Sequence, residues 1–312
     1  MTYNLNNKNI SIIIKNKLEF KPVYIRNFGL VQVTGHRLNL PPQDTFILYS
    51  PALEQILFDR SLVGWELQKS TYRTARALFE ALKDNLMQQY PMDSRFEQVN
   101  LAGSDWYMLQ PAYAKVYNSI LPRNYIAIKR FPIPGVFDEY GKQKFATEIS
   151  YKRFEAKGSL CILGETIATG ASLVDSLEAH LPYAIENGLK RMLIFTICGS
   201  KIGAERVYET IKKFGVEVTF IFGLGIFGLG KDGTALLWHD IENKEKALTL
   251  PEFEERSKKA FLPGECAIGD WGKRFTNTIS YLQEWRKELT LLGHPERFRV
   301  PEEYKEQMRE EL

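Results

Sequence analysis

The chain has 312 residues, which is enough for one large or two small domains. Its 41 basic and 38 acidic residues nearly cancel to a net charge of +3, so the composition does not favour a dedicated nucleic-acid-binding protein. The three cysteines are an odd, widely spaced set, which predicts buried free thiols in a reducing, cytoplasmic compartment.

Hydropathy also argues against membrane insertion. The longest apolar run, residues 218–230, is too short and too rich in glycine to span a bilayer. The first residues lack the basic-then-apolar pattern of a signal peptide. We therefore expect no membrane partner and no leader.

The first third of the chain begins with β-rich pieces and continues with a helix. Residues 1–68 show few helical signals, and we expect an N-terminal extension with short strands at 10–15, 23–26, 29–34 and 46–49. Ser70 is a favourable N-cap, and the apolar spacing that follows it predicts a long amphipathic helix up to about Tyr90.

A strand, helix and strand are predicted next, at 96–101, 110–121 and 125–129. Such a unit is expected to be right-handed with parallel strands. Residues 130–145 contain two prolines and two glycines between β-like flanks, which predicts a long hairpin or flap that returns along 146–153. An ordinary surface hairpin is the alternative interpretation.

The most informative stretch is residues 158–179. A short apolar strand at 159–163 leads into a loop of small and hydroxyl residues, and leucines at helical spacing begin at Leu173. The amide groups at such a helix start are unpaired and lie at the positive end of the helix dipole. This arrangement predicts a phosphate-binding loop.

The remaining elements complete an α/β pattern. Strands at 191–198 and 216–222 flank a helix at 204–214, which predicts an open, mostly parallel sheet with helices on its faces. We expect a charge-rich insertion at about 236–260. A small-residue loop, a helix and a charged tail follow at 263–278, 279–292 and 301–312.

The loop sequence CILGETIATGAS resembles the signature of type I phosphoribosyltransferases, in which an acidic patch precedes Ala/Asp-Thr-Gly-x-Ser/Thr. The resemblance implies that Glu165 serves the ribose or orients Mg²⁺, while Gly164 replaces a second carboxylate. By the same resemblance, the 5′-phosphate of phosphoribosyl pyrophosphate (PRPP) would be held by Ala168, Thr169, Gly170, Ala171 and Ser172.

The resemblance is strongest to the uracil phosphoribosyltransferase branch and covers about residues 70–278. It implies that the pyrophosphate lies against Ala102, Gly103 and Ser104, although Leu101 stands where the family has an arginine. Lys129 and Arg130, at the base of the flap, could also reach phosphates.

The segment 263–275 is similar to the uracil-binding segment of this branch, in which Pro-Gly leads to Gly-Asp-x-Gly-Asp-Arg. The resemblance implies that Ile268 and Gly269 read the base and that Asp270 contacts PRPP. Lys273 replaces an aspartate, and Trp271 replaces a small residue.

Three functional hypotheses follow from these residues. The first is an enzyme that makes a nucleoside monophosphate and pyrophosphate from PRPP and a uracil-like base. The second is a regulatory protein of the same fold that binds PRPP or a nucleotide without turnover. The third is a transferase with a different acceptor. The resemblance further implies small-molecule substrates, Mg²⁺ carried by the pyrophosphate rather than by a metal site of the protein, and a homodimer.

The expected division of the chain is an extension at 1–68, a phosphoribosyltransferase-like domain at 69–278 and a helical extension at 279–312.

Two other signals in the sequence receive less weight. Residues 223–228 fit G-x-G-x-x-G, but the turn and strand expected after them do not match a dinucleotide-binding unit. Trp106 and Tyr107 could stack on a ligand, although aromatic residues in such positions more often belong to the core.

Overall fold

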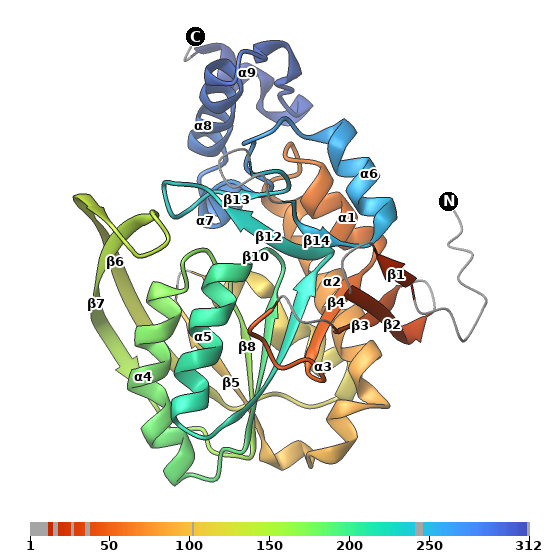
Figure 1. Ribbon diagram of the computed structural model, residues 1–312, viewed down its shortest axis with the longest axis vertical. Helices are drawn as coiled ribbons and strands as arrows, with labels where there is room; N and C mark the ends of the chain where they lie inside the picture. The colour runs from red at the N-terminus through yellow and green to blue at the C-terminus, as the bar shows by residue number, and fades with distance from the viewer. Residues whose placement is uncertain are drawn as a thin grey trace.

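A ten-stranded mixed sheet forms the centre of the computed structural model, which describes residues 12–14, 18–25, 28–34, 38–101, 103–240 and 246–310 (Figure 1). In spatial order its strands are β1 (Ile12–Ile14), β2 (Leu18–Ile25), β3 (Gly29–Thr34), β4 (Thr45–Tyr49), β11 (Glu217–Gly223), β9 (Arg191–Thr196), β8 (Leu160–Gly164), β5 (Arg95–Asn100), β6 (Arg123–Phe137) and β7 (Gln143–Arg153).

The six strands from β4 to β6 in this order are parallel, and antiparallel strands flank them at both ends. The expected open, mostly parallel sheet is therefore confirmed. The strand-helix-strand unit β5–α3–β6 is parallel, and residues 130–145 form the predicted long hairpin between β6 and β7. The buried strands β8 and β9 are nearly continuous apolar runs, as expected for a sheet covered on both faces.

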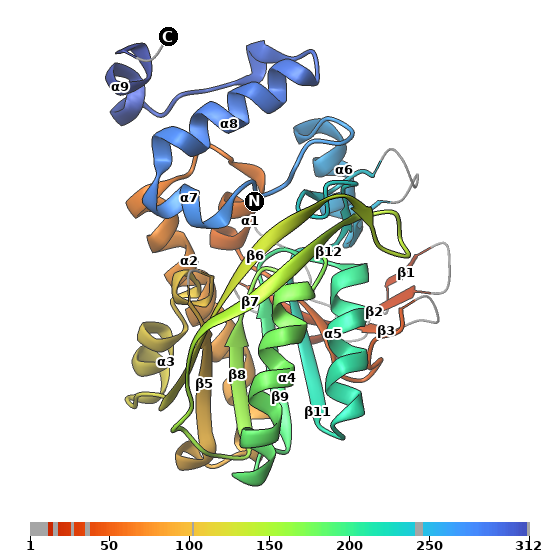
Figure 2. The ribbon, with the colours of Figure 1, turned by 90° about the vertical axis from the view of Figure 1, so that its left-hand side faces the viewer.

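Helices cover both faces of the sheet (Figure 2). One face carries α4 (Ala171–Glu186) and α5 (Lys201–Lys213), and the other carries α1 (Pro51–Phe58), α2 (Gly64–Lys83) and α3 (Leu109–Tyr117). The later helices are α6 (Pro251–Ala260), α7 (Trp271–Thr276), α8 (Thr278–Leu291) and α9 (Lys305–Glu310). A small second sheet contains β10 (Gly199–Ser200), β12 (Gly225–Leu229), β13 (Leu236–Leu237) and β14 (Leu248–Thr249).

The predicted helix from Ser70 to about Tyr90 is wrong at both ends. Helix α2 begins at Gly64, not at Ser70, and Ser70 is buried within it. The small Ser70 side chain lies where α2 meets α1, and its hydroxyl contacts Gln55 at 3.3 Å. The helix ends at Lys83 rather than near Tyr90. The side-chain amide of Asn85 donates a hydrogen bond to the carbonyl oxygen of Ala81 in the last turn.

Three further helices, α1, α6 and α7, were not predicted, and α6 lies within the charge-rich insertion expected at 236–260. Helix α1 has Pro51 in its first turn, and its N-cap Ser50 accepts a hydrogen bond from the amide of Leu53. Helix α7 interrupts the expected loop at 263–278, and its N-cap is Asp270. Residues 223–228 run through the end of β11 into β12, so no helix starts there, in agreement with the interpretation given above.

The N-terminal strands are joined to the rest of the sheet, because β4 pairs in parallel with β11. The expected strand pieces at 10–15 and 23–26 lie partly outside the described residues. Cys161, Cys198 and Cys266 are buried free thiols, as expected. None of the helices in the described ranges is long and apolar enough to cross a membrane.

Candidate functional site

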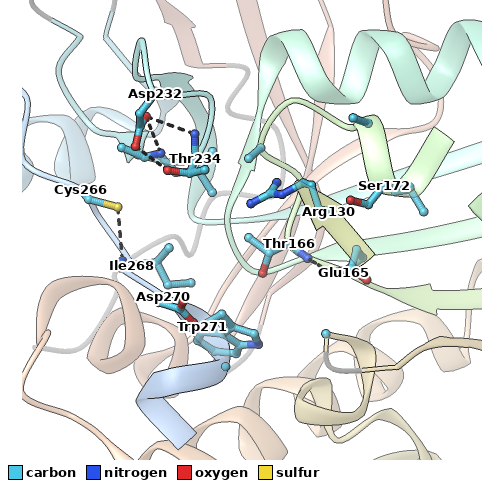
Figure 3. A pocket seen from close by; sticks show the side chains of 18 of the residues that line it. Arg130, Glu165, Thr166, Ser172, Asp232, Thr234, Cys266, Ile268, Asp270 and Trp271 are labelled. Atoms are coloured by element: carbon cyan, nitrogen blue, oxygen red, sulfur yellow. Dashed lines mark hydrogen bonds between the residues drawn. The ribbon is translucent and has the colours of Figure 1, made fainter. Parts of the chain in front are cut away.

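A cavity of about 630 Å³ opens where β5 and β8 end, beneath the β6–β7 hairpin (Figure 3). Segments that are far apart in the sequence line it. They are the ends of β5 and β8, the start of α4, the hairpin, the turn after β12, the loop before α7, part of α8, and Arg60. Of the residues predicted from the sequence, those that line the cavity are Gly103, Arg130, Glu165, Ala168, Gly170, Ala171, Ser172, Ile268, Gly269 and Asp270.

The predicted phosphate loop has a backbone that only glycine can adopt without strain. Gly170 is left-handed, with φ of 77°, and a Cβ atom there would lie 2.7 Å from the carbonyl oxygen of Gly203. Gly203, on α5, is equally constrained, because its Cβ would lie 2.1 Å from the carbonyl oxygen of Ala168. The two glycines let the loop pack directly against the start of α5.

The start of α4 presents amide groups to the cavity. The first amide bonded to a carbonyl within the helix is that of Val174, so the amides of Ser172 and Leu173 precede the helical ladder. No acidic residue lies in the first turn of this fully described helix, and both Ser172 and Leu173 line the cavity. This end of the cavity is therefore suited to an anion.

Thr169 is placed differently from the other loop residues. It is 3 % exposed and does not line the cavity. Its hydroxyl accepts a hydrogen bond from the amide of Ala171 at 3.4 Å, and its methyl group packs near Gly233. Thr169 therefore supports the conformation of the loop and does not face the cavity.

Glu165 lies half-buried at the end of β8, between the phosphate loop and β5. Its carboxylate accepts hydrogen bonds from the amide of Thr166 at 3.1 Å and from the hydroxyl of Ser104 at 3.4 Å. Burial raises the pKa of Glu165 to about 7, and the hydrogen bonds and the charge of Arg130 only partly oppose that rise. Glu165 can therefore change its charge near neutral pH.

The raised pKa has a consequence for stability that does not depend on ligand. The folded protein holds the Glu165 proton more tightly than the unfolded chain, whose ordinary value is 4.5. This difference in pKa contributes to the free energy of unfolding. The contribution is fully present below about pH 4 and is lost as the pH rises through about 7. We expect Glu165→Gln to unfold at a higher temperature than the wild type at pH 8, with the difference closing toward pH 4. Calorimetry of both proteins across that range measures it, and a pH-independent difference would contradict it.

Gly164, where the family motif has a carboxylate, has no room for a side chain. A Cβ atom there would lie 2.7 Å from both Cβ and Cγ of Tyr107. Tyr107 is fully buried, and its hydroxyl oxygen lies 3.0 Å from the hydroxyl of Thr166 and accepts from the amide of Ile197. The aromatic ring therefore occupies the space beside the strand, which explains the glycine.

Neither aromatic residue after β5 lines the cavity, as the core interpretation expected. Tyr107 packs beneath the site, and Trp106 stacks on Phe275 with ring centroids 4.9 Å apart.

The predicted pyrophosphate residues separate into different roles. Gly103 lines the cavity and lies against Glu165, because a Cβ there would be 2.6 Å from Oε1 of Glu165. Ser104 is buried and contacts Glu165 rather than the cavity. Leu101 lines the cavity, and Ala102 lies outside the described residues.

On the hairpin, Arg130 reaches the cavity and Lys129 does not. Successive side chains of a strand point to opposite faces, and Ile128 and Arg130 both line the cavity. The Arg130 guanidinium stacks on Phe145 at 4.4 Å from the ring centroid. Desolvation lowers the pKa of Arg130, while attraction to the carboxylates of Asp232, Asp270 and Glu165 opposes that shift. Arg130 is thus a cation with acids from three other segments around it (Figure 3).

The loop before α7 forms the opposite wall. Gly269 has φ of 67°, and its Cβ would lie 2.5 Å from the ring of Tyr281, so the loop packs tightly onto α8. Trp271 lines the cavity while its ring packs on Tyr107 and Phe275. Lys273, which reverses a charge in the motif, forms an ion pair with Glu284 at 2.5 Å and lies 3.9 Å from Asp270.

Several residues that line the cavity were not predicted from the sequence. Asn100 ends β5, and its side-chain oxygen accepts from Ser176 at 2.8 Å. Asp232 lies in the turn after β12, where it accepts from the amides of Thr234 and Ala235. Arg60 is buried and paired with Glu288 of α8 at 2.6 Å. Asn100 could have been noticed at its strand end, whereas no local signal marks Arg60 or Asp232.

Comparison with known proteins gives matches among solved structures alone. No protein-family model matches the chain. No curated protein matches it either. It is similar to adenine phosphoribosyltransferase from Trypanosoma brucei in complex with AMP, pyrophosphate and ribose-5-phosphate, with 15 % identity over 58 % of this chain and 84 % of that one and a TM-score of 0.36. It is also similar to a hypoxanthine phosphoribosyltransferase from Staphylococcus aureus, with 14 % identity over 62 % of this chain and 91 % of that one and a TM-score of 0.30. At these identities the similarity concerns the fold alone.

Proposed function

We propose that this protein transfers the phosphoribosyl group of PRPP to a nucleobase of the uracil type, forming a nucleoside 5′-monophosphate and pyrophosphate. One observation carries the proposal. The amide-lined start of α4, the carboxyl of Glu165 and the loop at 268–270 face one cavity, with Arg130 between them. An anion site, a carboxylate and a separate wall for a base are the three parts that the reaction needs.

In this proposal the 5′-phosphate binds at the amides of Ser172 and Leu173, with Ala171 beside them in the cavity wall. Glu165 then lies where the ribose would extend, and Ser104 keeps its carboxylate in place. The backbone at Ile268 and Gly269 would read the base, and Asp270 would contact PRPP from the same loop.

The reaction breaks the bond from the anomeric carbon to the pyrophosphate oxygen and forms a bond from that carbon to a nitrogen of the base. The bonding electrons leave with the pyrophosphate, which can take up the proton that the base nitrogen loses. Ionised Glu165 would stabilise the positive charge that develops on the ribose, and Arg130 would stabilise the departing pyrophosphate. The hairpin over the cavity would exclude water, the competing nucleophile.

We propose that magnesium enters with the substrate, bound to the pyrophosphate of PRPP. Within the ranges described above, no group of three or more His, Cys, Asp or Glu side chains could hold a metal ion. The cavity wall nevertheless carries five carboxylates, those of Glu165, Asp232, Asp270, Glu284 and Glu288, and two guanidinium groups, those of Arg60 and Arg130. A Mg²⁺ ion bound to the pyrophosphate would offset the negative charge that the pyrophosphate and these carboxylates bring together, and Glu165 and Asp270 could contact it.

The alternatives rest on the positions that depart from the family motif. Gly164 and Leu101 each remove one polar contact to PRPP, which favours a regulatory protein that binds PRPP or a nucleotide without turnover. Trp271 replaces a small residue in the base segment and lines the cavity, which favours a transferase for a different acceptor.

A homodimer is also part of the proposal. Exposed apolar side chains gather on the hairpin, namely Phe131, Val136, Phe137, Tyr140, Ile149 and Tyr151, each at least 40 % exposed. Apolar clusters of this kind commonly mark protein interfaces. Sedimentation velocity should give a mass of twice 36.0 kDa, and a monomer at micromolar concentration would contradict this part.

The phosphate site is tested by placing a negative charge at the start of α4. Ser172→Asp should weaken PRPP binding about 100-fold, because a carboxylate would compete with the phosphate for the same amides. An acid in the first turn favours the helix, so the variant should unfold at or above the wild-type temperature. Calorimetric titration measures the affinity, with Ser172→Asn as the neutral control of similar size. Equal affinities for the two variants would overturn the assignment.

A further inference from the structure

Arg206, on α5, connects two parts of the molecule that the proposed function treats separately. One of its guanidinium nitrogens donates to the carbonyl oxygen of Thr169, in the phosphate loop, at 3.2 Å. The other donates to Asp138, at the tip of the β6–β7 hairpin, at 2.6 Å. The same guanidinium lies over the ring of Tyr140 at 5.0 Å from its centroid, and exposed Glu139 lies 3.5 Å from it.

The contact with Asp138 is well shielded. The Asp138 side chain is 10 % exposed and that of Arg206 is 23 % exposed, so water screens the ion pair less than it screens a surface pair. The second oxygen of Asp138 accepts from the amides of Tyr140 and Lys142, which closes the turn at the hairpin tip. These hydrogen bonds and the Arg206 contact lower the pKa of Asp138, and the group is therefore ionised at neutral pH.

The tip is also docked on the side of the second sheet. The ammonium group of Lys142, itself 2 % exposed, donates to the carbonyl oxygen of Leu229 at 2.6 Å. The amide of Gln143 donates to the carbonyl oxygen of Lys231 at 2.9 Å. The hairpin tip is therefore held between α5 on one side and β12 with the turn after it on the other (Figure 2).

We propose that Arg206 is a positioning residue that couples the phosphate loop to the hairpin lid. The planar guanidinium of Arg206 makes both hydrogen bonds at once. The position of the Thr169 carbonyl and the position of the lid tip therefore depend on each other. A phosphate that orders the loop then favours the closed lid, and an open lid loosens the loop. The contacts stand on the structure alone, whereas the response to phosphate rests on the proposed function.

Hydrogen exchange followed by mass spectrometry tests this coupling in the full-length protein. In the absence of ligand, Arg206→Gln and Asp138→Asn should each speed amide exchange in the hairpin, residues 131–145, by roughly tenfold, as expected for loss of a shielded charged hydrogen bond. Glu139→Gln is the matched control, since Glu139 is 74 % exposed and lies 3.5 Å from Arg206. Hairpin exchange that is unchanged in both variants would overturn the proposal.

A second comparison separates coupling from simple anchoring. With inorganic phosphate or ribose 5-phosphate present, the wild type should show slower exchange both at residues 169–174 and in the hairpin. In Arg206→Gln and Asp138→Asn the loop should still be protected while the hairpin is not. Phosphate protection of the hairpin that persists in both variants would overturn the coupling. Wild-type protein in which neither probe protects the loop would instead contradict the proposed phosphate site, and the ligand-free comparison would still decide whether Arg206 holds the lid.

Discussion

Replacing Glu165 by glutamine is expected to lower PRPP-dependent transfer by about 10²–10³-fold in kcat. Glu165 lines the cavity, and Gly164 leaves it as the single carboxyl of the family's acidic patch. Glutamine keeps the shape and a hydrogen-bonding oxygen but cannot offset positive charge on the ribose. Steady-state release of pyrophosphate measures the effect, and KM for PRPP should change much less than kcat.

The control for this variant is Glu178→Gln, which removes an exposed carboxylate from α4. It should leave kcat unchanged. The wild-type rate should also rise with pH through about 7, since the proposed role of Glu165 needs its ionised form and burial raises its pKa to that value. A Glu165→Gln enzyme that keeps its rate within threefold would remove Glu165 from the chemistry.

Gly164→Asp, which would complete the family motif, is expected to destabilise the protein and to add no activity. Its Cβ would lie 2.7 Å from Tyr107, whose ring is fully buried, so the core must shift. Overpacking costs about 1–3 kcal/mol, and an unpaired buried carboxylate adds further cost. The total loss in the free energy of unfolding should therefore be about 3 kcal/mol or more.

Chemical denaturation measures this loss, and two companion variants identify its cause. Gly164→Ala should show the steric part alone. Tyr107→Ala combined with Gly164→Asp should lose less than the sum of the two single changes, because the cavity left by the ring accepts the new side chain. A Gly164→Asp protein as stable as the wild type and faster in transfer would show that Tyr107 does not block this position.

The strand-loop-helix at the centre of the site was predictable because local signals act together there. A buried strand, a run of small residues and a helical leucine spacing specify β8, the loop after it and α4 within about 20 residues. The hairpin was predictable for a similar reason, since its prolines and glycines lie between two β-rich flanks.

The rest of the site depends on tertiary packing. Ser70 has the local features of a helix start, yet contact with α1 buries it within α2. Tyr107 fills the space beside Gly164 from a segment 57 residues earlier, and nothing near either residue in the sequence signals that contact. Arg60 and Asp232 reach the cavity through loops whose positions are set by α8 and the second sheet. The Thr169 side chain likewise packs near Gly233, which comes much later in the sequence, where a Cβ atom would lie 3.1 Å from its methyl carbon.

The most direct test of phosphoribosyl transfer is release of pyrophosphate from PRPP with Mg²⁺ across a panel of free bases, for the wild type and Glu165→Ala. The proposal predicts release that requires one base, uracil or a close analogue, and that collapses in the variant. Folded protein that releases no pyrophosphate with any base of the panel would contradict the transfer reaction.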